Sequence, residues 1–498
     1  MQYLSTRDDK VKVRSSAAIK KGISDEGGLF VPKEIPYLTL SDIKKLENKS
    51  YIEKTVFILK KYLSDFLLKE LEECAKSAYS KEKFGLDNPA PLKKLSENMY
   101  ILELWHGPTC AFKDMALQIF PYLLSKAVKK TGEKNNIVIL AATSGDTGKA
   151  ALAGFKDVDK TSIAVFYPTF GVSDIQKLQM ITQEGKNVDV VGINGSFDDA
   201  QSTVKKIFTD EKIKDIIVQR GYVFSSANSI NWGRLSPQIV YYFSAYCDLL
   251  ASGEISLGEE INVCVPTGNF GNILAAYYAK KMGLPIKKLI CASNSNNVLT
   301  NFLKTGVYDR NREFYATCSP SMDILISSNV ERLLYDLSGQ NVKKVSKWMR
   351  ELDKKGEYFV GAEMKKKLNK IFWSAYCDDY FTKECIYKTN KEFGYTVDTH
   401  TAVAIDVYKQ YLNETGDETK TVIVSTASPF KFSETVLSAL GKYDEKENMN
   451  SLELINLLSD VTGESIPEGL KNLSYDKIRF DKVINKEDME SELLDFLK

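Results

Sequence analysis

One lysine with the surroundings of a covalent catalyst lies in the segment W-H-G-P-T-C-A-F-K-D, residues 105–114. Lys113 directly follows Phe112, and an apolar stripe typical of a helix begins after it, with Pro121 predicting a kink or break in that helix. A lysine amine bonds a carbonyl carbon only when it is deprotonated, which burial at a helix N-terminus favours. The alternative is a solvated surface lysine. We therefore take Lys113 as the candidate nucleophile.

A first polar loop, A-T-S-G-D-T-G-K at residues 142–149, joins a predicted strand to a predicted helix. Its hydroxyls and backbone N–H groups suit a carboxylate, and the alternative is a helix cap formed by Asp146 or Thr147. Ala150 stands where a nucleotide-binding P-loop needs Ser or Thr, so we do not expect a nucleoside triphosphate. The candidate residues of this loop are Ser144, Asp146 and Thr147.

Two further loops could bind a phosphate. The loop G-N-F-G-N, residues 268–272, offers glycines and the positive end of a helix dipole, and the alternative is a plain tight turn. Its spacing is not G-x-G-x-x-G, which argues against a nicotinamide dinucleotide. In the segment S-A-N-S-I-N-W-G-R, residues 226–234, the guanidinium suits a phosphate, although a turn with a solvated arginine is preferred when the segment is taken alone. The candidates are Gly268, Asn269, Phe270, Gly271, Asn272, Asn228, Ser229 and Arg234.

The elements that must position these loops alternate between β-rich runs and helical patterns from about residue 98. Such alternation predicts an α/β fold with a mostly parallel sheet. Ser196 reads as the N-cap of a helix. The expected strands are 136–140, 162–166, 188–193, 261–265 and 421–425, and the expected helices are 55–78, 149–155, 235–249, 273–282 and most of 325–395.

Composition narrows the functional classes. The 498 residues carry 67 basic and 66 acidic side chains, and this balance gives no reason to expect a nucleic-acid partner. Eight scattered cysteines without C-x-x-C, and only two histidines, argue against a zinc site and a disulfide framework. We expect His106 and His400 to be structural. The polar N-terminus and the lack of a long apolar run predict no membrane partner and a reduced, cytoplasmic compartment.

Taken together and in this order, the motifs resemble those of threonine synthases of the long bacterial and fungal form. Further matching motifs are G-G-L-F-V-P at 27–32, S-P-S-M-D-I-L at 319–325, His400-Thr401-Ala402 and Thr426-Ala427-x-Pro429-x-Lys431-Phe432. The resemblance implies a fold-type II, tryptophan synthase β-like enzyme dependent on pyridoxal phosphate (PLP), with two parallel-sheet α/β domains and an N-terminal extension. We expect an N-terminal domain at 1–97, a lysine-bearing domain at 98–250, and a phosphate-binding domain with a helical insertion and C-terminal helices at 251–498.

The resemblance also implies a role for each candidate. Lys113 would hold PLP as a Schiff base, residues Gly268 to Asn272 would bind its phosphate, and Thr426 would bond its pyridine nitrogen. Ser144, Asp146 and Thr147 would surround the substrate carboxylate and the phenolic oxygen of PLP. The implied reaction is a lyase step of amino-acid biosynthesis that converts O-phospho-L-homoserine and water to L-threonine and phosphate. The substrate phosphate would be bound by Asn228, Ser229, Arg234 and Asn272.

Three departures from the family pattern stand out: Thr399 replaces a proline, Ser428 a histidine and Phe430 an alanine. Thr426 is retained, so PLP binding is still expected. Two other hypotheses stay open: a different PLP enzyme, either a phospho-lyase or a threonine or serine dehydratase, and a non-catalytic sensor. We expect a monomer, with a dimer as the alternative.

Overall fold

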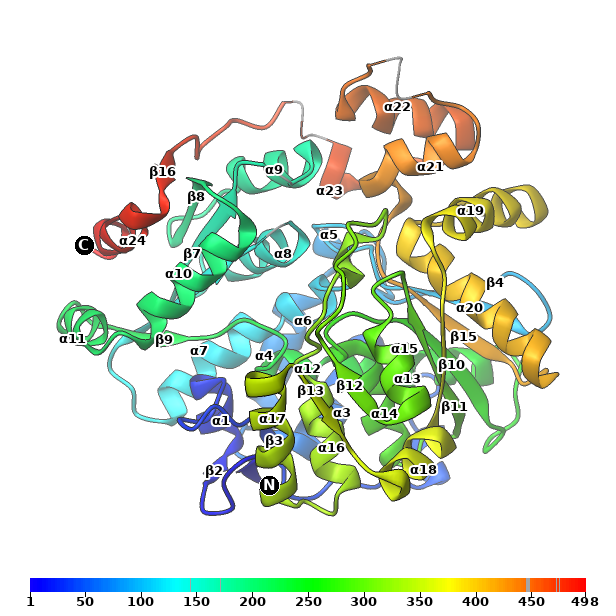
Figure 1. The fold of residues 1–498 in the computed structure, drawn as a ribbon, viewed down its shortest axis with the longest axis horizontal. Coiled ribbons are helices and arrows are strands. Elements are labelled where there is room, and N and C mark those ends of the chain that lie inside the picture. The colour runs from blue at the N-terminus through cyan, green and yellow to red at the C-terminus, as the bar shows by residue number, and fades with distance from the viewer. Residues whose placement is uncertain (144, 171, 445–447, 472, 474) are drawn as a thin grey trace.

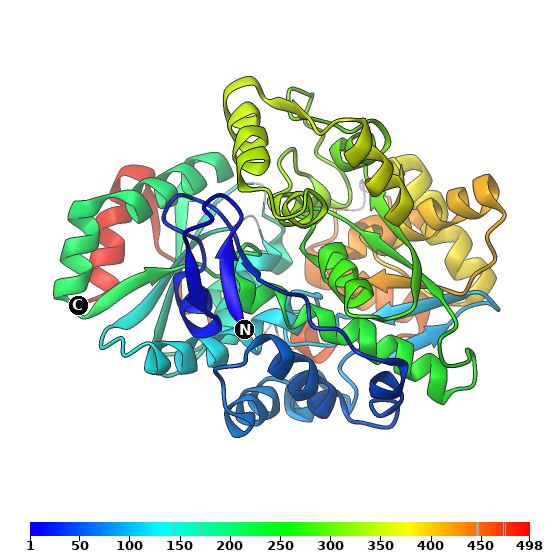
Figure 2. The same cartoon turned by 90° about the horizontal axis from the view of Figure 1, so that it is seen from below.

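The computed structural model describes residues 1–143, 145–170, 172–444, 448–471, 473 and 475–498, so the candidate Ser144 lies outside the described residues. Two mainly parallel sheets, one of six strands and one of five, lie side by side with helices around them (Figure 1). The blue N-terminal segment packs along one side of both halves (Figure 2). The predicted α/β class with parallel sheets is confirmed.

The six-stranded sheet has the order β14-β11-β10-β15-β5-β4, and only β4 and β5 are antiparallel neighbours. Its central strands are buried on both faces, which explains their continuous apolar sequences. Val263 packs on one face with α13 (Gln238–Ala251) and α14 (Gly271–Lys281), whereas Cys264 packs on the other with α20 (Thr399–Thr415). The strands are β4 (Leu92–Lys94), β5 (Met99–Glu103), β10 (Ile261–Pro266), β11 (Ile286–Ser293), β14 (Phe372–Tyr376) and β15 (Thr421–Ser425).

The five-stranded sheet has the order β16-β8-β7-β6-β9, and its described pairings are all parallel. Its strands are β6 (Asn136–Ala142), β7 (Thr161–Pro168), β8 (Val188–Asn194), β9 (Tyr222–Ser225) and β16 (Val483–Asn485). The predicted N-cap is confirmed, because the Ser196 hydroxyl accepts the backbone N–H of Asp199 at the start of α10. The helices of this half are α7 (Phe120–Lys130), α8 (Asp146–Phe155), α9 (Asp174–Ile181), α10 (Phe197–Thr209), α11 (Glu211–Gln219) and α24 (Met489–Phe496).

The N-terminal segment corrects one prediction, since the helix expected over 55–78 is two helices. Between them Asp65 turns toward α1, and its carboxylate accepts the backbone N–H of Ser16 at 3.1 Å and the hydroxyl of Ser16 at 2.6 Å. This contact requires the chain to leave the helical path after Tyr62. The elements are β1 (Gln2–Ser5), β2 (Lys12–Arg14), α1 (Ser15–Lys21), β3 (Phe30–Pro32), α2 (Leu40–Lys44), α3 (Tyr51–Tyr62), α4 (Leu68–Ala78) and α5 (Lys81–Phe84).

The region 325–395 is mainly helical, as predicted, but the prediction missed β14. This run, F-W-S-A-Y, pairs in parallel with β11 as the edge of the larger sheet. Lysine-rich helices on both sides hide so short a strand in the helical pattern. The remaining elements are α15 (Val298–Thr305), β12 (Val307–Asp309), α16 (Val330–Leu337), α17 (Val342–Lys355), β13 (Glu357–Phe359), α18 (Ala362–Ile371), α19 (Asp379–Phe393), α21 (Ser433–Ala439), α22 (Ser451–Thr462) and α23 (Glu468–Lys471).

Both sheets join strands that lie far apart in the sequence. Strand β5 pairs with β15 in the larger sheet, and β16 near the C-terminus pairs with β8 in the smaller one, while the domain limits at 97/98 and 250/251 stay predictions. Within the described residues, no helix combines the length and apolar content needed to cross a bilayer.

Candidate active site

Lys113 stands immediately before the four-residue helix α6 (Asp114–Leu117). The helix is interrupted between α6 and α7, close to Pro121, where a kink or break was predicted. The loop before it is tied to the end of β15, since Phe112 N donates to Thr426 O at 2.8 Å. The Lys113 Nζ lies 3.4 Å from both Asp146 Oδ2 and Ser321 Oγ. Only 11% of the side chain is exposed. Burial is the main cause that lowers the pKa of Lys113, so this lysine loses its proton more easily than an ordinary lysine.

Asp114 shapes the loop that carries this lysine. Its carboxylate accepts the backbone N–H and the hydroxyl of Thr109, each at 2.8 Å. Gly107 leaves room for it, because a Cβ there would lie 2.5 Å from the Asp114 Cβ. Burial raises the pKa of Asp114 to about 6. The loop is therefore held by internal hydrogen bonds before any ligand binds.

The loop around Asp146 is built by Thr143. The Thr143 Oγ1 accepts the N–H groups of Gly145 and Gly148 at 3.1 and 3.0 Å, so Thr143, and not Asp146 or Thr147 as in the alternative interpretation, bonds the N–H groups at the start of α8. The Asp146 carboxylate is thereby free to bond Lys113, Lys431 and Gln176. Burial alone would raise the pKa of Asp146, but the charges of Lys431 and Lys113 outweigh it and hold the pKa below its usual range.

The Thr147 side chain is half-buried beside Asp146, and its hydroxyl has no hydrogen-bond partner among the described residues.

The loop 268–272 joins β10 to α14, as predicted. Phe270 adopts the left-handed conformation, with φ of 62°, and Asn269 is exposed. A Cβ on Gly268 would lie 2.7 Å from Ser321 O, whereas one on Gly271 would meet no protein atom closer than 3.5 Å. The loop therefore packs tightly on residue 321 at one end, whereas at the other a Cβ would make only ordinary van der Waals contacts.

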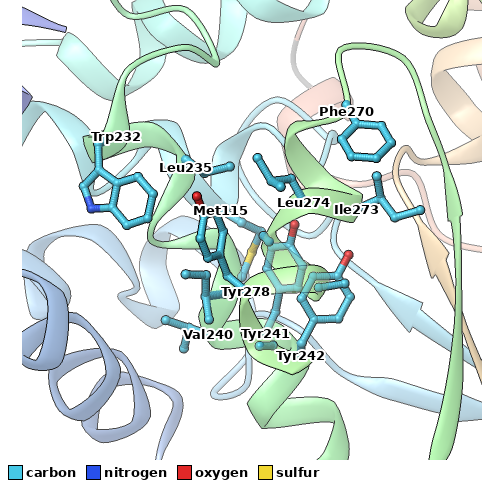
Figure 3. Packing of buried hydrophobic residues seen from close by; sticks show 14 of the residues in the cluster. Met115, Trp232, Leu235, Val240, Tyr241, Tyr242, Phe270, Ile273, Leu274 and Tyr278 are labelled. Carbon is cyan, nitrogen blue, oxygen red and sulfur yellow. The ribbon is translucent and has the colours of Figure 1, made fainter. Parts of the chain in front are cut away.

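Asn272 presents an unused donor at the start of α14. Its Oδ1 accepts the hydroxyls of Tyr241 and Tyr242, two buried side chains of α13 that Figure 3 shows next to α14. Its buried Nδ2 has no partner among the described residues. A buried amide without a partner costs free energy, so this donor is suited to an anionic ligand.

Arg234, in the short helix α12 (Trp232–Leu235), is buried at 6% exposure. One nitrogen donates to Ala227 O at 2.8 Å, and no carboxylate within the described residues forms an ion pair with it. Burial lowers the pKa of Arg234 to about 10. The solvated arginine that was preferred for this segment taken alone is therefore wrong. The Ser229 hydroxyl accepts a hydrogen bond from the Asn329 side-chain amide at 3.1 Å, and Asn228 is exposed.

Thr426 follows β15 directly and is buried, with its hydroxyl free of hydrogen bonds to other described groups. Thr426 and Lys113 therefore come from loops at the ends of two neighbouring strands, β15 and β5. In open α/β sheets, ligands bind beyond such carboxyl ends.

Three residues of this site were not predicted as site residues: Ser321, Lys431 and His400. Ser321 N donates to His400 Nε2 at 3.1 Å, and His400 Nδ1 lies 2.7 Å from Asp398 Oδ2, so His400 has the structural role expected of it. Lys431 reaches Asp146 from the turn after β15. Ser321 and Lys431 lie in the motifs S-M-D-I-L and P-x-K-F, which could have marked them as candidates. The motifs alone do not show which residues they contact.

Family models match most of the chain: threonine synthase N terminus at residues 2–79, pyridoxal-phosphate dependent enzyme at 86–363, and threonine synthase, C-terminal at 401–491. The structure is similar to the PLP-bound threonine synthase of Brucella melitensis, with a TM-score of 0.89, 33% identity and 100% of each chain covered. It is also similar to threonine synthase from yeast, with a TM-score of 0.88, 34% identity, and coverage of 100% of this chain and 98% of that one.

The curated relatives agree. Threonine synthase of Schizosaccharomyces pombe is 36% identical over 89% of this chain and 90% of its own length. The human protein threonine synthase-like 1 is 42% identical over 90% of this chain, but the chain spans only 62% of that relative's length.

The fold and the lysine site thus define a PLP-dependent enzyme of fold-type II. Within that class, the chain belongs to the threonine synthase family.

The donor set of the site fits PLP. A largely buried amine at Lys113 suits an aldehyde, and the unpartnered Asn272 amide beside a glycine at the start of α14 suits a phosphate at a helix N-terminus. The free hydroxyl of Thr426 suits a ring nitrogen.

Proposed function

We propose that this chain converts O-phospho-L-homoserine and water to L-threonine and phosphate. The observation that carries the proposal is the buried Arg234, which has no described carboxylate partner and lies close enough to Lys113 for its charge to lower the pKa of that lysine. A buried cation without a counter-ion favours an anionic ligand. The substrate phosphate would supply that charge.

In this proposal Lys113, Asp146, Thr426 and the loop Gly268–Asn272 hold PLP. When bound, PLP supplies an electron-accepting ring next to the substrate Cα. Because Thr426 offers a hydroxyl and not a carboxylate, it would leave the ring nitrogen largely unprotonated. The Asp146 carboxylate and the Asn272 amide would be among the groups that hold PLP.

The chain's own residues would then handle the substrate. Ser144 and Thr147 bind its carboxylate, and Asn228, Ser229, Arg234 and Asn272 bind its phosphate. Lys113 removes the proton at Cα and serves as the base and acid for the later proton transfers, since its amine lies beside the substrate. Phosphate leaves from Cγ, and water adds at Cβ.

A phospho-lyase would use the same arrangement and release phosphate with an oxo-acid. A dehydratase needs no phosphate site, so the unpaired Arg234 argues against it. A non-catalytic sensor would leave Lys113 without its proposed role in proton transfer.

The test is to mix the purified chain with PLP and O-phospho-L-homoserine and to measure phosphate and amino acid together. Equimolar threonine and phosphate are expected. Phosphate with an oxo-acid would move the function to a phospho-lyase, and no turnover would overturn the proposal. Lys113→Ala is the control, because it should abolish product under either enzymatic function while sparing simple binding.

We propose further that the chain acts as a monomer in a reduced, cytoplasmic compartment. The eight cysteines support the compartment, since all of them are free thiols.

A further inference from the structure

One carboxylate in this site lies between two lysines. Asp146 Oδ2 is 3.4 Å from the Lys113 Nζ, while Asp146 Oδ1 accepts a close hydrogen bond from the Lys431 Nζ. The two lysines come from different loops, and Asp146 is 285 positions from Lys431. The proposed function uses Lys113 and Asp146 but gives Lys431 no task.

Lys431 is held in place from several sides. Its side chain has no exposure, and its Nζ also donates to Thr109 O at 3.0 Å. The turn that carries it is fixed, because Ser428 N donates to Cys110 O at 3.1 Å and the Ser428 hydroxyl accepts Phe430 N–H at 3.3 Å. Ser428 is the residue that replaces the family's histidine, and its hydroxyl bonds within the turn that carries Lys431.

The charges in this cluster decide which lysine can lose its proton. Lys113 faces one carboxylate, Asp146, and two cations, Lys431 and Arg234, together with the Ser321 hydroxyl and the Phe112 ring. On its other side Lys431 faces the Thr109 carbonyl and the charges of Asp114 and Lys149. Without Lys431, the near carboxylate would have Lys113 as its closest cation and would stabilise the ammonium form.

We propose that Lys431 is a positioning residue that serves as the counter-ion of Asp146 and thereby leaves the amine of Lys113 unprotonated. The inference rests on the proposed role of Lys113 as the PLP lysine. The effects of the neighbouring charges on Lys113 have the directions that this proposal requires: Asp146 raises the pKa of Lys113, whereas Lys431 and Arg234 lower it.

The experiment measures the protonation of Lys113 by trapping. The full chain, stripped of PLP, is incubated with PLP across a pH series. The amine condenses with the aldehyde and releases water, and borohydride then reduces the C=N bond. Peptide mass spectrometry gives the fraction of Lys113 that is modified at each pH. In Lys431→Met the midpoint should rise by about 1 to 2 pH units, because the charge of Asp146 is then matched only by Lys113.

Two variants serve as controls. Lys431→Met combined with Asp146→Asn removes one charge of each sign, so its midpoint should return close to that of the unaltered chain. Lys149→Met removes a nearby lysine whose Nζ bonds Gln183 at 2.8 Å and not Asp146, so its midpoint should not move.

An unchanged midpoint in folded Lys431→Met, or a double variant that behaves like Lys431→Met, would overturn the inference. If Lys431→Met does not fold, Asp146→Asn is compared with the double variant, and equal midpoints would overturn it. Modification of other lysines with none at Lys113 would overturn both the inference and the cofactor assignment. The trapping uses no amino-acid substrate, so its failure is distinct from an absence of threonine synthesis.

Discussion

The hydroxyl oxygen of Ser321 lies 3.4 Å from the amine nitrogen of Lys113, although 208 positions separate the two residues. The backbone of Ser321 is held by its N–H bond to His400 and by the tight packing of its carbonyl against Gly268. Ser321 therefore links the lysine, the loop 268–272 and the helix α20 that carries His400.

Ser321→Ala should lower kcat about 10-fold, the effect of losing one hydrogen bond to a charged or reacting amine. The KM for the phosphorylated substrate should change little, because Ser321 contacts Lys113 and not Arg234. Steady-state kinetics measure both constants. Ser252→Ala, at the exposed end of α13, is the matched control and should leave both unchanged. A rise in KM alone would contradict this role for Ser321.

Arg234→Met should lower kcat/KM for O-phospho-L-homoserine about 100-fold, or about 2.7 kcal/mol, mainly through KM. The reason is the loss of a buried cation that has no described carboxylate partner. PLP retention, measured by absorbance after gel filtration, should persist. Arg350→Met on the exposed face of α17 is the control. Equal losses with phosphorylated and unphosphorylated substrates would show that Arg234 does not bind the phosphate.

Two glycines should respond differently to alanine. Gly268→Ala places a Cβ 2.7 Å from Ser321 O, so it should cost about 1–3 kcal/mol of stability as well as PLP affinity. Gly271→Ala meets no protein atom closer than 3.5 Å, so the stability of the PLP-free chain should be retained. Its PLP affinity should nevertheless fall at least about 10-fold if a phosphate approaches that backbone closely. Thermal unfolding and PLP titration distinguish the two effects, and unchanged PLP affinity in Gly271→Ala would place the phosphate elsewhere.

Stability should depend on pH through Asp189, in β8 and away from the site. Burial, with the charge of Glu492, raises the pKa of Asp189 to about 6, and its Oδ2 has no partner among the described residues. Because the folded pKa lies above the unfolded value near 4, this carboxyl favours folding below pH 4 and loses that advantage as pH rises through 6. Asp189→Asn should therefore add about 1–2 kcal/mol at pH 8, after allowance for solvent screening.

Chemical denaturation of both chains at pH 4 and pH 8 measures this difference, which should nearly vanish at the lower pH. An equal gain at both values would mean that the charge of Asp189 is not the cause.

The sequence predicted those parts of the molecule that depend on local pattern. Strand β15 lies where it was expected, and the loops with Lys113 and Asp146 meet. The contacts of Ser321 and Lys431 could not be predicted in this way, because they arise from packing between distant loops. Strand β14 was missed because an edge strand of five residues has no pattern of its own between two lysine-rich helices. The roles of the candidate residues stay predictions until the variants above are measured.

Strand β5 ends at Glu103, yet its parallel neighbour β15 begins only at Thr421. During translation the nascent chain therefore carries β5 exposed along one edge while most of the polypeptide is still being made. Lys113 leaves the ribosome early, but Thr426 and Lys431 follow only near the end of synthesis. If PLP binding needs Thr426, as proposed, it would be possible only in the finished or nearly finished chain. An arrested chain ending before residue 421 should carry no tightly bound PLP.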